Sequence, residues 1–272
     1  MDLVKELAGG LSNKIYLIND AVLLRIFGQH SDALVNSKNE RYVMRELGKR
    51  GIAPQILLEF DNGRLEQFIK NSRSLSLNDL VNQQILENLV IKIKEIHHTE
   101  LELDKTPVLC KNIENWFVEA KKVLPDHDVY EFKDTVIGLI NGATTVGICL
   151  CHNDLQKNNI LINKDDSTVK LIDFEYSGYN YIEFDIANFL CELSIDYLDS
   201  EFKINEEVDI IIQKRICTLY LQDPDLFDNL KPFIIAAHFL WTLWAIVKSG
   251  TGGSFDYRQY ANVRFNMLKR LI

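Results

Sequence analysis

Three polar residues in the middle of the chain have the types and the order that phosphoryl transfer requires. They are Asp154, Asn159 five residues later, and Asp173, which ends a short apolar run. Transfer of a phosphoryl group from a nucleotide needs an acceptor hydroxyl aimed in line, a divalent metal ion and neutralisation of charge. Asp154 can orient the hydroxyl or accept its proton, while Asn159 and Asp173 offer oxygen ligands suited to Mg²⁺, or to Mn²⁺ in its place.

The two motifs that contain these residues carry more weight together than apart. The first reads His152-Asn-Asp-Leu-Gln-Lys-Asn-Asn159 and the second reads Leu171-Ile-Asp-Phe-Glu175. Taken singly, the Asn and Asp residues of the first motif would be ordinary turn residues. Their order and separation match the catalytic loop and the metal-binding turn of kinases. Because two coupled motifs are hard to produce by chance, we interpret them as a catalytic centre.

The first forty residues contain groups suited to nucleotide phosphates. Arg25 lies within the apolar run 22–27, where a charged residue is unusual unless it has a specific role. Glu40 starts the next helical pattern. Together they resemble the strand cation and helix glutamate of kinases, with the fork of arginine in place of lysine. The segment Gly9-Gly-Leu-Ser12-Asn13 could bring backbone N–H groups and a hydroxyl near phosphates. Each feature alone also fits a surface side chain or a plain turn.

A pair of tryptophans indicates either core packing or a cation-binding cage. Trp241 and Trp244 lie three residues apart, on one face of a helix, and such pairs normally belong to a core. In the alternative, the rings would attract a quaternary ammonium group by cation–π interaction. Tyr197 and Tyr260 would then close the sides, and Glu192 would add a carboxylate. Beside a kinase-like loop the cage gains weight, because both sites predict one substrate, a cationic alcohol.

Two differently built parts of the chain must position these residues. The segment 1–70 alternates short apolar runs with turn signals, and Asn62-Gly63 is a strong hairpin signal. We expect a helix around 38–50 and strands at 15–18, 22–27, 55–60 and 65–69.

After a polar linker at 71–76, the pattern of apolar residues becomes mainly that of helices. A long helix is expected to begin at Ser76 or Asn78 and to end near His97. Apolar runs interrupt the later helical patterns at 147–151, 160–162 and 169–172. The sequence thus predicts an α+β protein with a small β-rich N-terminal lobe, 1–70, and a larger, mainly helical C-terminal lobe, 71–272. A cleft between two lobes is a common ligand site.

Composition limits the partners and the compartment. The 272 residues carry 30 basic and 39 acidic side chains, for a formal net charge of −9, without a Lys/Arg-rich run, so a nucleic-acid partner is not expected. No secretory signal is visible, and five cysteines without framework spacing favour a reduced, cytoplasmic chain. Cys149-x-Cys151-His152 lacks a second pair of zinc ligands, so we interpret the cysteines as core residues. The apolar segment 233–247 is too short to span a bilayer, and no stable membrane insertion is expected.

Taken together, these motifs resemble the choline/ethanolamine kinase family. The segment from Asp173 to Asn188 is similar to the family's signature after the metal aspartate, and it is more specific than the generic kinase motifs. The run 22–28 resembles the family's third strand, in which arginine is the usual cation, and 63–69 resembles its hinge. The similarity extends from about Leu7 to Leu268.

The resemblance implies a protein-kinase-like fold and an enzyme that uses ATP to phosphorylate the hydroxyl of choline, the first step of phosphatidylcholine synthesis. The nucleotide site implied in this way comprises Ser12, Asn13, Arg25, Gln67 and Phe68. The implied choline site comprises Asp154, Tyr176, Glu192, Tyr197, Trp241, Trp244 and Tyr260.

The chain departs from the family's pattern in three places. Phe189 stands where the family often has histidine, the loop between Trp244 and Phe255 looks about one residue shorter, and the N-terminal extension of larger members is missing. The resemblance leaves open whether the chain forms a homodimer.

Several alternatives remain. An ethanolamine kinase would share nearly all the motifs, although the amino-acid sequences of the hinge and of the segment around Glu192 look more like those of choline kinases. An aminoglycoside phosphotransferase would share the catalytic loop but should line its pocket with carboxylates. A protein kinase is disfavoured, because Glu175 replaces the glycine of the Asp-Phe-Gly turn. A non-catalytic choline-binding protein would not need the residues of the catalytic loop.

Overall fold

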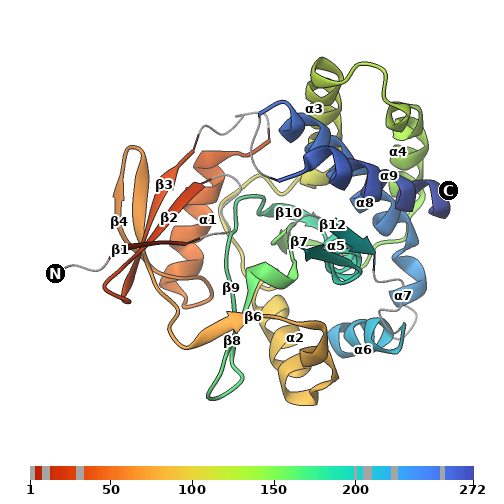
Figure 1. Cartoon of the computed structure of the whole chain (residues 1–272). Helices are drawn as coiled ribbons and strands as arrows, with labels where there is room; N and C mark the ends of the chain where they lie inside the picture. The colour runs from red at the N-terminus through yellow and green to blue at the C-terminus, as the bar shows by residue number, and fades with distance from the viewer. Residues whose placement is uncertain are drawn as a thin grey trace.

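A computed structural model describes residues 4–7, 13–28, 34–198, 201–204, 210–221, 226–251 and 255–272. It consists of a small antiparallel sheet with one helix at one end of the molecule and a larger, mainly helical part at the other (Figure 1).

The N-terminal sheet has five antiparallel strands in the order β1-β2-β3-β5-β4. Asn19 and Asp20 have φ angles of 52° and 50°, the conformation that a tight turn between β2 and β3 requires. Helix α1 starts after Asn36, whose side chain accepts a hydrogen bond from the backbone N–H of Asn39. The predicted strands and helix are confirmed to within two residues, and β1 was not predicted. The elements are β1 Val4–Leu7, β2 Asn13–Ile18, β3 Val22–Phe27, α1 Ser37–Lys49, β4 Ile56–Phe60 and β5 Gly63–Gln67.

In the hairpin between β4 and β5, the second strand begins two residues earlier than predicted, at Gly63 instead of Leu65. Phe60 pairs with Gly63, so the turn residues are Asp61 and Asn62, and Gly63 belongs to the strand. A Cβ atom on Gly63 would lie 2.4 Å from the backbone oxygen of Arg25 and 2.7 Å from the Phe60 ring. The glycine is therefore required by the close approach of β3, and not by the turn.

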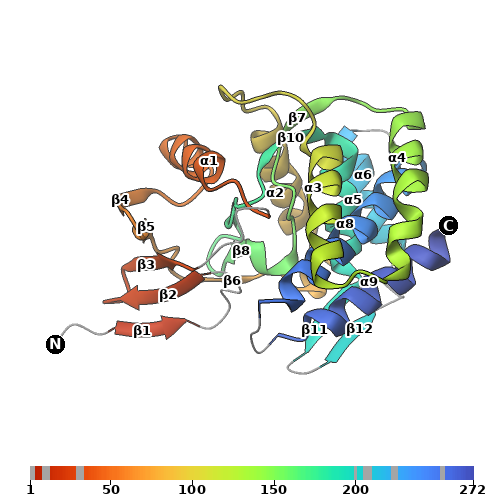
Figure 2. The same cartoon turned by 90° about the horizontal axis from the view of Figure 1, so that it is seen from above.

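The larger part is built around α8, Lys231–Ser249, which packs against α3, α5 and α9 (Figures 1 and 2). The other helices are α2 Gln83–His97, α3 Val108–Val123, α4 Lys133–Gly142, α5 Ile182–Leu193, α6 Ile210–Leu221, α7 Leu226–Asn229 and α9 Tyr257–Leu271. Short 3₁₀ turns lie at Leu77–Val81, Asp128–Phe132 and Lys157–Asn159.

Short strands between these helices carry the catalytic motifs. The pair β7 and β10 flanks the first motif, and β6, β8 and β9 form a three-stranded sheet beside it. The three predicted apolar runs become β7, β8 and β9. The bounds are β6 Ser72–Ser74, β7 Ile148–Cys151, β8 Ile160–Asn163, β9 Val169–Leu171, β10 Gly178–Tyr181, β11 Ile195–Leu198 and β12 Glu201–Ile204.

The long helix predicted from Ser76 or Asn78 begins later. Ser76 forms a capping box with Asp79, but the turn that follows is a short 3₁₀ helix. The side chain of Asn82 accepts hydrogen bonds from the N–H groups of Gln84 and Ile85 and caps α2 instead. Two competing cap residues six positions apart made this boundary ambiguous in the sequence.

Helix α8 is longer than the apolar run from which it was predicted. By length and composition its 19 residues would suffice to cross a membrane, whereas the apolar run 233–247 is shorter. However, 83% of the apolar window is buried inside the protein. We therefore interpret α8 as the central core helix.

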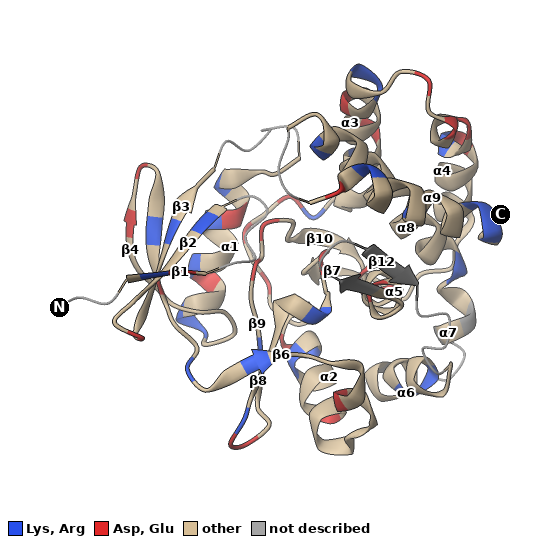
Figure 3. Cartoon of the chain, viewed as in Figure 1, with Lys and Arg blue, Asp and Glu red and all other residues tan. Residues whose placement is uncertain are grey.

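Charged residues are spread over both parts of the described chain. Figure 3 shows Lys and Arg as well as Asp and Glu on both parts, whereas α9 carries Arg258, Arg264, Lys269 and Arg270 and no acidic residue.

These two parts together form the protein-kinase-like, two-lobed α+β fold that the sequence predicted, with a small β-rich lobe and a larger helical lobe. Strand β5 ends at Gln67 and β6 begins at Ser72. We propose that the lobes meet in this connection, near residue 70.

Candidate active site

The catalytic loop is held in place by one buried carboxylate. Asp185 on α5 accepts hydrogen bonds from the backbone N–H groups of His152 (3.0 Å) and Asn153 (2.7 Å). A charged acceptor makes such bonds stronger than neutral ones. The ring of His152 also lies 2.9 Å from the backbone oxygen of Ile172, which ties the loop to the segment before Asp173. The two motifs predicted to act together are thus physically joined.

His97 at the end of α2 neutralises Asp185. Its Nε2 lies 2.9 Å from the carboxylate, and its Nδ1 lies 2.5 Å from the hydroxyl of Tyr220. Burial alone would lower the pKa of His97, but the hydrogen bond and charge of Asp185, helped by Cys149, outweigh burial and raise the pKa to about 9. The His97–Asp185 pair is therefore a buried ion pair.

The histidine that lies beside Cys149 and Cys151 is His97, and not His152 of the Cys149-x-Cys151-His152 motif. Within the described ranges, donor atoms of His97, Cys149 and Cys151 lie within 4.8 Å of one another. Both ring nitrogens of His97, however, already contact Asp185 and Tyr220. We assign these residues to the support of the catalytic loop, in keeping with the core role predicted for the cysteines.

Asp154 and Asn159 lie side by side at the centre of the site. The amide of Asn159 donates to the carboxylate Oδ2 and to the backbone oxygen of Asp154, each at 2.9 Å, which leaves the amide oxygen of Asn159 for another partner. Burial, followed by the charges of Asp173 and Glu175, raises the pKa of Asp154 well above its ordinary value. A carboxylate with a raised pKa is a stronger base toward a hydroxyl proton.

Asp173 is held in an uncommon backbone conformation. Its φ is 65°, and so is that of Asn153 in the facing loop. Left-handed non-glycine residues are sparse and concentrate at functional sites. The amide of Asn153 donates to the backbone oxygens of Tyr176 and Gly178, so the contacts of the site keep this conformation in place.

Glu175 is an acidic residue of the site that was not predicted as a site residue. Burial and the nearby charge of Asp173 raise its pKa to about 8. Asp154, Asp173 and Glu175 thus bring three carboxyl groups into one mutually repelling cluster. Hard oxygen donors in such a cluster fit a divalent cation such as Mg²⁺.

A chain of alternating charges connects the small lobe to Asp173. The Nε of Arg25 lies 2.7 Å from Glu66, and its Nη1 lies 3.4 Å from Asp173. Glu66 is shared with Arg64, 2.6 Å away, and the other end of Arg64 lies 2.6 Å from Glu40. Although burial opposes it, the charges of the two arginines lower the pKa of Glu66.

The expected direct pair of Arg25 and Glu40 is therefore replaced by an indirect one. Glu40 contacts Arg64, and Glu66 bridges the two arginines. The sequence contained a usable signal, because Arg64 and Glu66 lie two apart on β5 and so on one face, opposite Arg25 on β3. Arg64 is fully buried, with 0% exposure, whereas a charged residue on a short hairpin is usually solvated.

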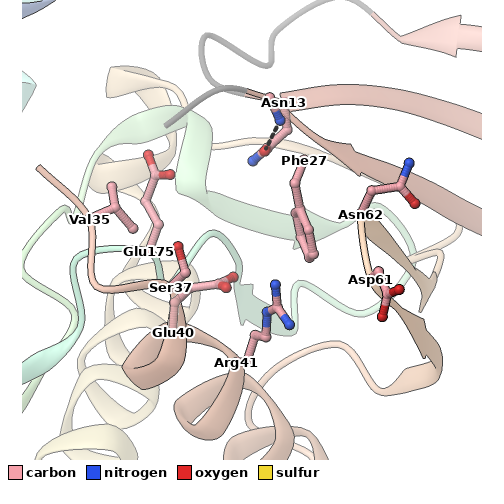
Figure 4. A pocket seen from close by; sticks show the side chains of 10 residues that line it. Asn13, Phe27, Val35, Ser37, Glu40, Arg41, Asp61, Asn62 and Glu175 are labelled. Carbon is pink, nitrogen blue, oxygen red and sulfur yellow. Dashed lines mark hydrogen bonds between the residues drawn. The ribbon is translucent and has the colours of Figure 1, made fainter. Parts of the chain in front are cut away.

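A cavity of about 560 Å³ lies beneath the N-terminal sheet, beside this charge chain. Figure 4 shows Asn13, Phe27 and Glu40 on its wall, with Glu175 reaching toward it from the larger lobe. The side-chain oxygen of Asn13 also accepts a hydrogen bond from the backbone N–H of Gly28 at 3.3 Å. Ser12 lies outside the described residues.

The predicted hinge residues lie at the end of β5. The backbone N–H of Gln67 donates to the oxygen of Gln55 on the approach to β4, at 2.8 Å. Gln67 is exposed and Phe68 is half-buried. Their contact with adenine remains a prediction.

Four of the predicted aromatic residues come together in the larger lobe. The Trp241 ring lies 5.5 Å from Trp244 and 5.4 Å from Tyr176, in edge-to-face geometry, and Trp244 lies 6.1 Å from Tyr260. Their exposed fractions are only 3–8%. Trp116 on α3, not singled out by sequence, packs on Trp241 at 6.0 Å.

Hydrogen bonds fix this aromatic cluster to the catalytic motifs. Trp244 Nε1 donates to the hydroxyl of Tyr176 at 2.7 Å, and Trp241 Nε1 donates to Asn188 at 2.6 Å. Tyr176 follows Glu175 directly, and it also lines a second cavity of about 490 Å³ together with Glu175. The rings thus lie beside the acidic centre, although their packing alone would also suit a core.

Glu192 differs from its predicted role. Its carboxylate is paired with the buried guanidinium of Arg264, and the hydroxyl of Tyr260 lies 3.4 Å away. Because Arg264 already balances its charge, Glu192 orients the cluster more than it supplies a free negative charge. Arg264, one helical turn after Tyr260, was not singled out from the sequence. The side chain of Tyr197 lies outside the described residues.

We predict that Glu66→Gln lowers the free energy of unfolding by about 3 kcal/mol, because two buried arginines lose the carboxylate they share, which leaves Arg64 with Glu40 alone and Arg25 with the longer contact to Asp173. Productive use of ATP should fall as Arg25 shifts. Glu59→Gln, which breaks the more exposed pair with Arg45, should cost less than about 1 kcal/mol. Urea unfolding and the KM for ATP measure both effects. Equal stability losses in the two variants would show that Glu66 does not hold the chain of charges.

A second prediction concerns pH. Because the pKa of His97 is raised from 6.5 to about 9, folding favours its protonated form. This contribution, roughly 3 kcal/mol, should be complete below pH 6.5 and disappear as the pH rises through 9. Unfolding free energies measured between pH 6 and 10 should therefore decline in the wild-type protein more steeply than in His97→Gln. Parallel profiles would contradict the ion pair.

Comparison with known proteins agrees with this geometry. Residues 4–269 match the family model described as choline/ethanolamine kinase. The chain is 28% identical to probable choline kinase 2 of Arabidopsis thaliana, over 96% of this chain and 83% of that protein. It is 26% identical to probable ethanolamine kinase A of Dictyostelium discoideum, over 97% and 83%.

A solved structure is also similar over nearly the whole length. The crystal structure of choline kinase from Cryptosporidium parvum Iowa II superposes with a TM-score of 0.83 at 28% identity, covering 99% of this chain and 88% of that one. Because the family model spans nearly the whole sequence and the fold, catalytic loop and acidic turn agree with it, this chain belongs to the choline/ethanolamine kinase family.

Proposed function

We propose that this kinase transfers the γ-phosphoryl group of ATP to the hydroxyl of choline and forms phosphocholine. One observation carries the choice of substrate: a cluster of aromatic rings lies directly against the acidic centre, joined to it through Tyr176. Aromatic faces attract a quaternary ammonium group. A substrate bound there would have its hydroxyl near the residues proposed to act on it.

The nucleotide is proposed to lie between the lobes, with its phosphates near Arg25 and Asn13. The N–H of Gln67 is already engaged by Gln55, so we assign the adenine contact to the backbone that follows, at Phe68. Ser12 is retained in the proposal as a phosphate contact on sequence grounds alone.

The acidic centre fits Mg²⁺. Asp173, with the amide oxygen of Asn159, would hold the ion, and a cation would relieve the repulsion that helps to raise the pKa values of Asp154 and Glu175. When bound, the ion neutralises charge on the β- and γ-phosphates. We add Glu175 to the predicted ligands, since it shares this cluster.

The residues of the chain account for the remaining chemistry. Asp154 accepts a hydrogen bond from the substrate hydroxyl and takes its proton as the oxygen–phosphorus bond forms. The bond between the γ-phosphorus and the bridging oxygen breaks, and its electron pair leaves with ADP. Arg25, aligned by Glu66, offsets the negative charge of the phosphates. Asn159 keeps Asp154 oriented through its two hydrogen bonds.

The neighbouring substrates fit the described residues less well. Ethanolamine carries a smaller, better hydrated ammonium group, which gains less from ring faces. An aminoglycoside carries several ammonium groups, and the one carboxylate within the ring cluster, Glu192, is already paired with Arg264. All five cysteines are free, which supports the proposed cytoplasmic location.

The wild-type protein is expected to release ADP with choline at a higher kcat/KM than with ethanolamine, to be inactive toward aminoglycosides, and to lose activity in excess chelator. Asp154→Asn should reduce kcat at least about 100-fold, because it removes a positioned base, with an unchanged melting temperature. A coupled ADP-release assay measures all of these. Near wild-type kcat in Asp154→Asn would remove this residue from the catalytic centre.

Trp244→Leu tests the cage against the core. Loss of one desolvated cation–π contact, about 2 kcal/mol, should raise the KM for choline roughly thirtyfold and that for ethanolamine much less, with the KM for ATP unchanged. Phe265→Leu, which removes a buried ring that packs on His127 and Phe132, is the matched core control. If Trp244→Leu lowers the melting temperature as Phe265→Leu does and keeps the choline-to-ethanolamine ratio, the rings are only core.

A further inference from the structure

A cation of the protein itself lies on the aromatic cluster. Lys248 is in the last turn of α8, four residues after Trp244 and therefore on the same face. Its ammonium nitrogen lies 5.9 Å from the centre of the Trp244 ring, within the range of a cation–π contact. Only 8% of Lys248 is exposed. A buried lysine in contact with a ring is uncommon, because lysine usually extends its charge to solvent.

The same ammonium group also acts on the acidic centre. Burial lowers the pKa of Lys248, whereas the charge of Glu175 opposes that change. Lys248 in turn opposes the rise in the pKa of Glu175 that burial and Asp173 cause. Lys248 is therefore electrostatically coupled to the acidic turn while it contacts Trp244, the ring joined to that turn through Tyr176.

Three other rings lie close to Trp244. Trp241 and Tyr257 each approach it at 5.5 Å, and Tyr260 at 6.1 Å, all edge to face. Because Lys248 lies over the Trp244 ring, a substrate cation that binds this ring must either share it with Lys248 or displace Lys248. In the first case the positive charge of Lys248 repels the substrate cation, and in the second case moving Lys248 off the ring costs free energy.

We infer that Lys248 determines substrate specificity by placing a competing positive charge on the ring that receives the substrate's ammonium group. The inference rests on the proposed function, because it assumes a cationic alcohol at the aromatic cluster. Its consequence is a pocket that binds cations less tightly than its rings alone would allow. The effect depends on substrate charge, unlike the effect of Trp244, which depends on the methyl groups of choline.

Two other roles for Lys248 make different predictions. Lysine in the last turn of a helix is favourable to the helix dipole, which would affect stability but not the response to substrate charge. A lysine that contacted the transferred phosphoryl group would support kcat and the KM for ATP. The two roles can therefore be separated from a specificity role by kinetics.

The experiment compares Lys248→Met with Lys248→Arg, which keeps the charge, and with Lys231→Met, a neutralised exposed lysine at the other end of α8. The probes are choline and 3,3-dimethylbutan-1-ol, a neutral alcohol of nearly the same shape. Two unit charges about 8 Å apart at an effective dielectric constant of about 20 change a binding constant by roughly ten- to thirtyfold. Lys248→Met should therefore lower the KM for choline about tenfold and leave the inhibition constant of the neutral alcohol within about twofold. Lys248→Arg and Lys231→Met should retain the wild-type values.

Several outcomes would overturn the inference. The first is an unchanged KM for choline in both Lys248→Met and a second neutral variant, Lys248→Gln. The second is an equal change in the KM for choline and in the inhibition constant of the neutral alcohol, which would indicate packing. The third is a loss confined to kcat or to the KM for ATP, which would indicate a phosphate contact. These results leave the proposed function intact as long as the wild-type protein phosphorylates choline. A wild-type protein inactive toward both choline and ethanolamine would instead overturn the proposed function, and the inference with it.

Discussion

The need to satisfy one buried carboxylate, Asp185, organises the larger lobe. Its oxygens bind two backbone N–H groups of the catalytic loop and the imidazolium of His97, so that α5, α2 and the loop meet at one point. One turn further along α5, Asn188 accepts from Trp241 and donates to the backbone of Leu155. A single helix thereby fixes the loop and the aromatic cluster relative to each other, and the orientation of Asp154 depends on both.

Charge is handled differently on the two sides of the site. In the small lobe, Glu40, Arg64, Glu66 and Arg25 alternate in sign, so each buried charge has an opposite neighbour. In the larger lobe, Asp154 and Glu175 are buried beside the charge of Asp173, and burial together with this repulsion raises the pKa values of Asp154 and Glu175. The balanced side provides a rigid wall. In the proposed function, the unbalanced side would favour binding of a divalent cation and acceptance of a proton.

The sequence was most informative where function depends on a fixed spacing along the chain. Asp154, Asn159 and Asp173 could be selected because a loop and a turn present them at set intervals, and the helix face of Trp241 and Trp244 follows from a separation of three. It was least informative about partners distant in sequence. The bridge from Glu40 through Arg64 and Glu66 depends on the strand order β3-β5, and the pairing of Glu192 with Arg264 depends on the packing of α9. Gly63 follows an asparagine and therefore resembled a turn residue in the sequence. The close approach of β3, which actually requires the glycine, leaves no signal in the neighbouring residues.

The contact between Arg25 and Asp173 has a thermodynamic consequence. A guanidinium group beside the aspartate already supplies positive charge where a divalent ion is proposed to bind, so Asp173 itself is not left uncompensated in the metal-free protein. Incoming metal and phosphates must then share these two partners: the ion competes for Asp173 as the phosphates draw on Arg25. Binding of the metal ion to Asp173 releases Arg25 for the phosphates, and binding of the phosphates to Arg25 releases Asp173 for the metal ion. Metal and nucleotide should therefore bind as one complex more readily than either does alone.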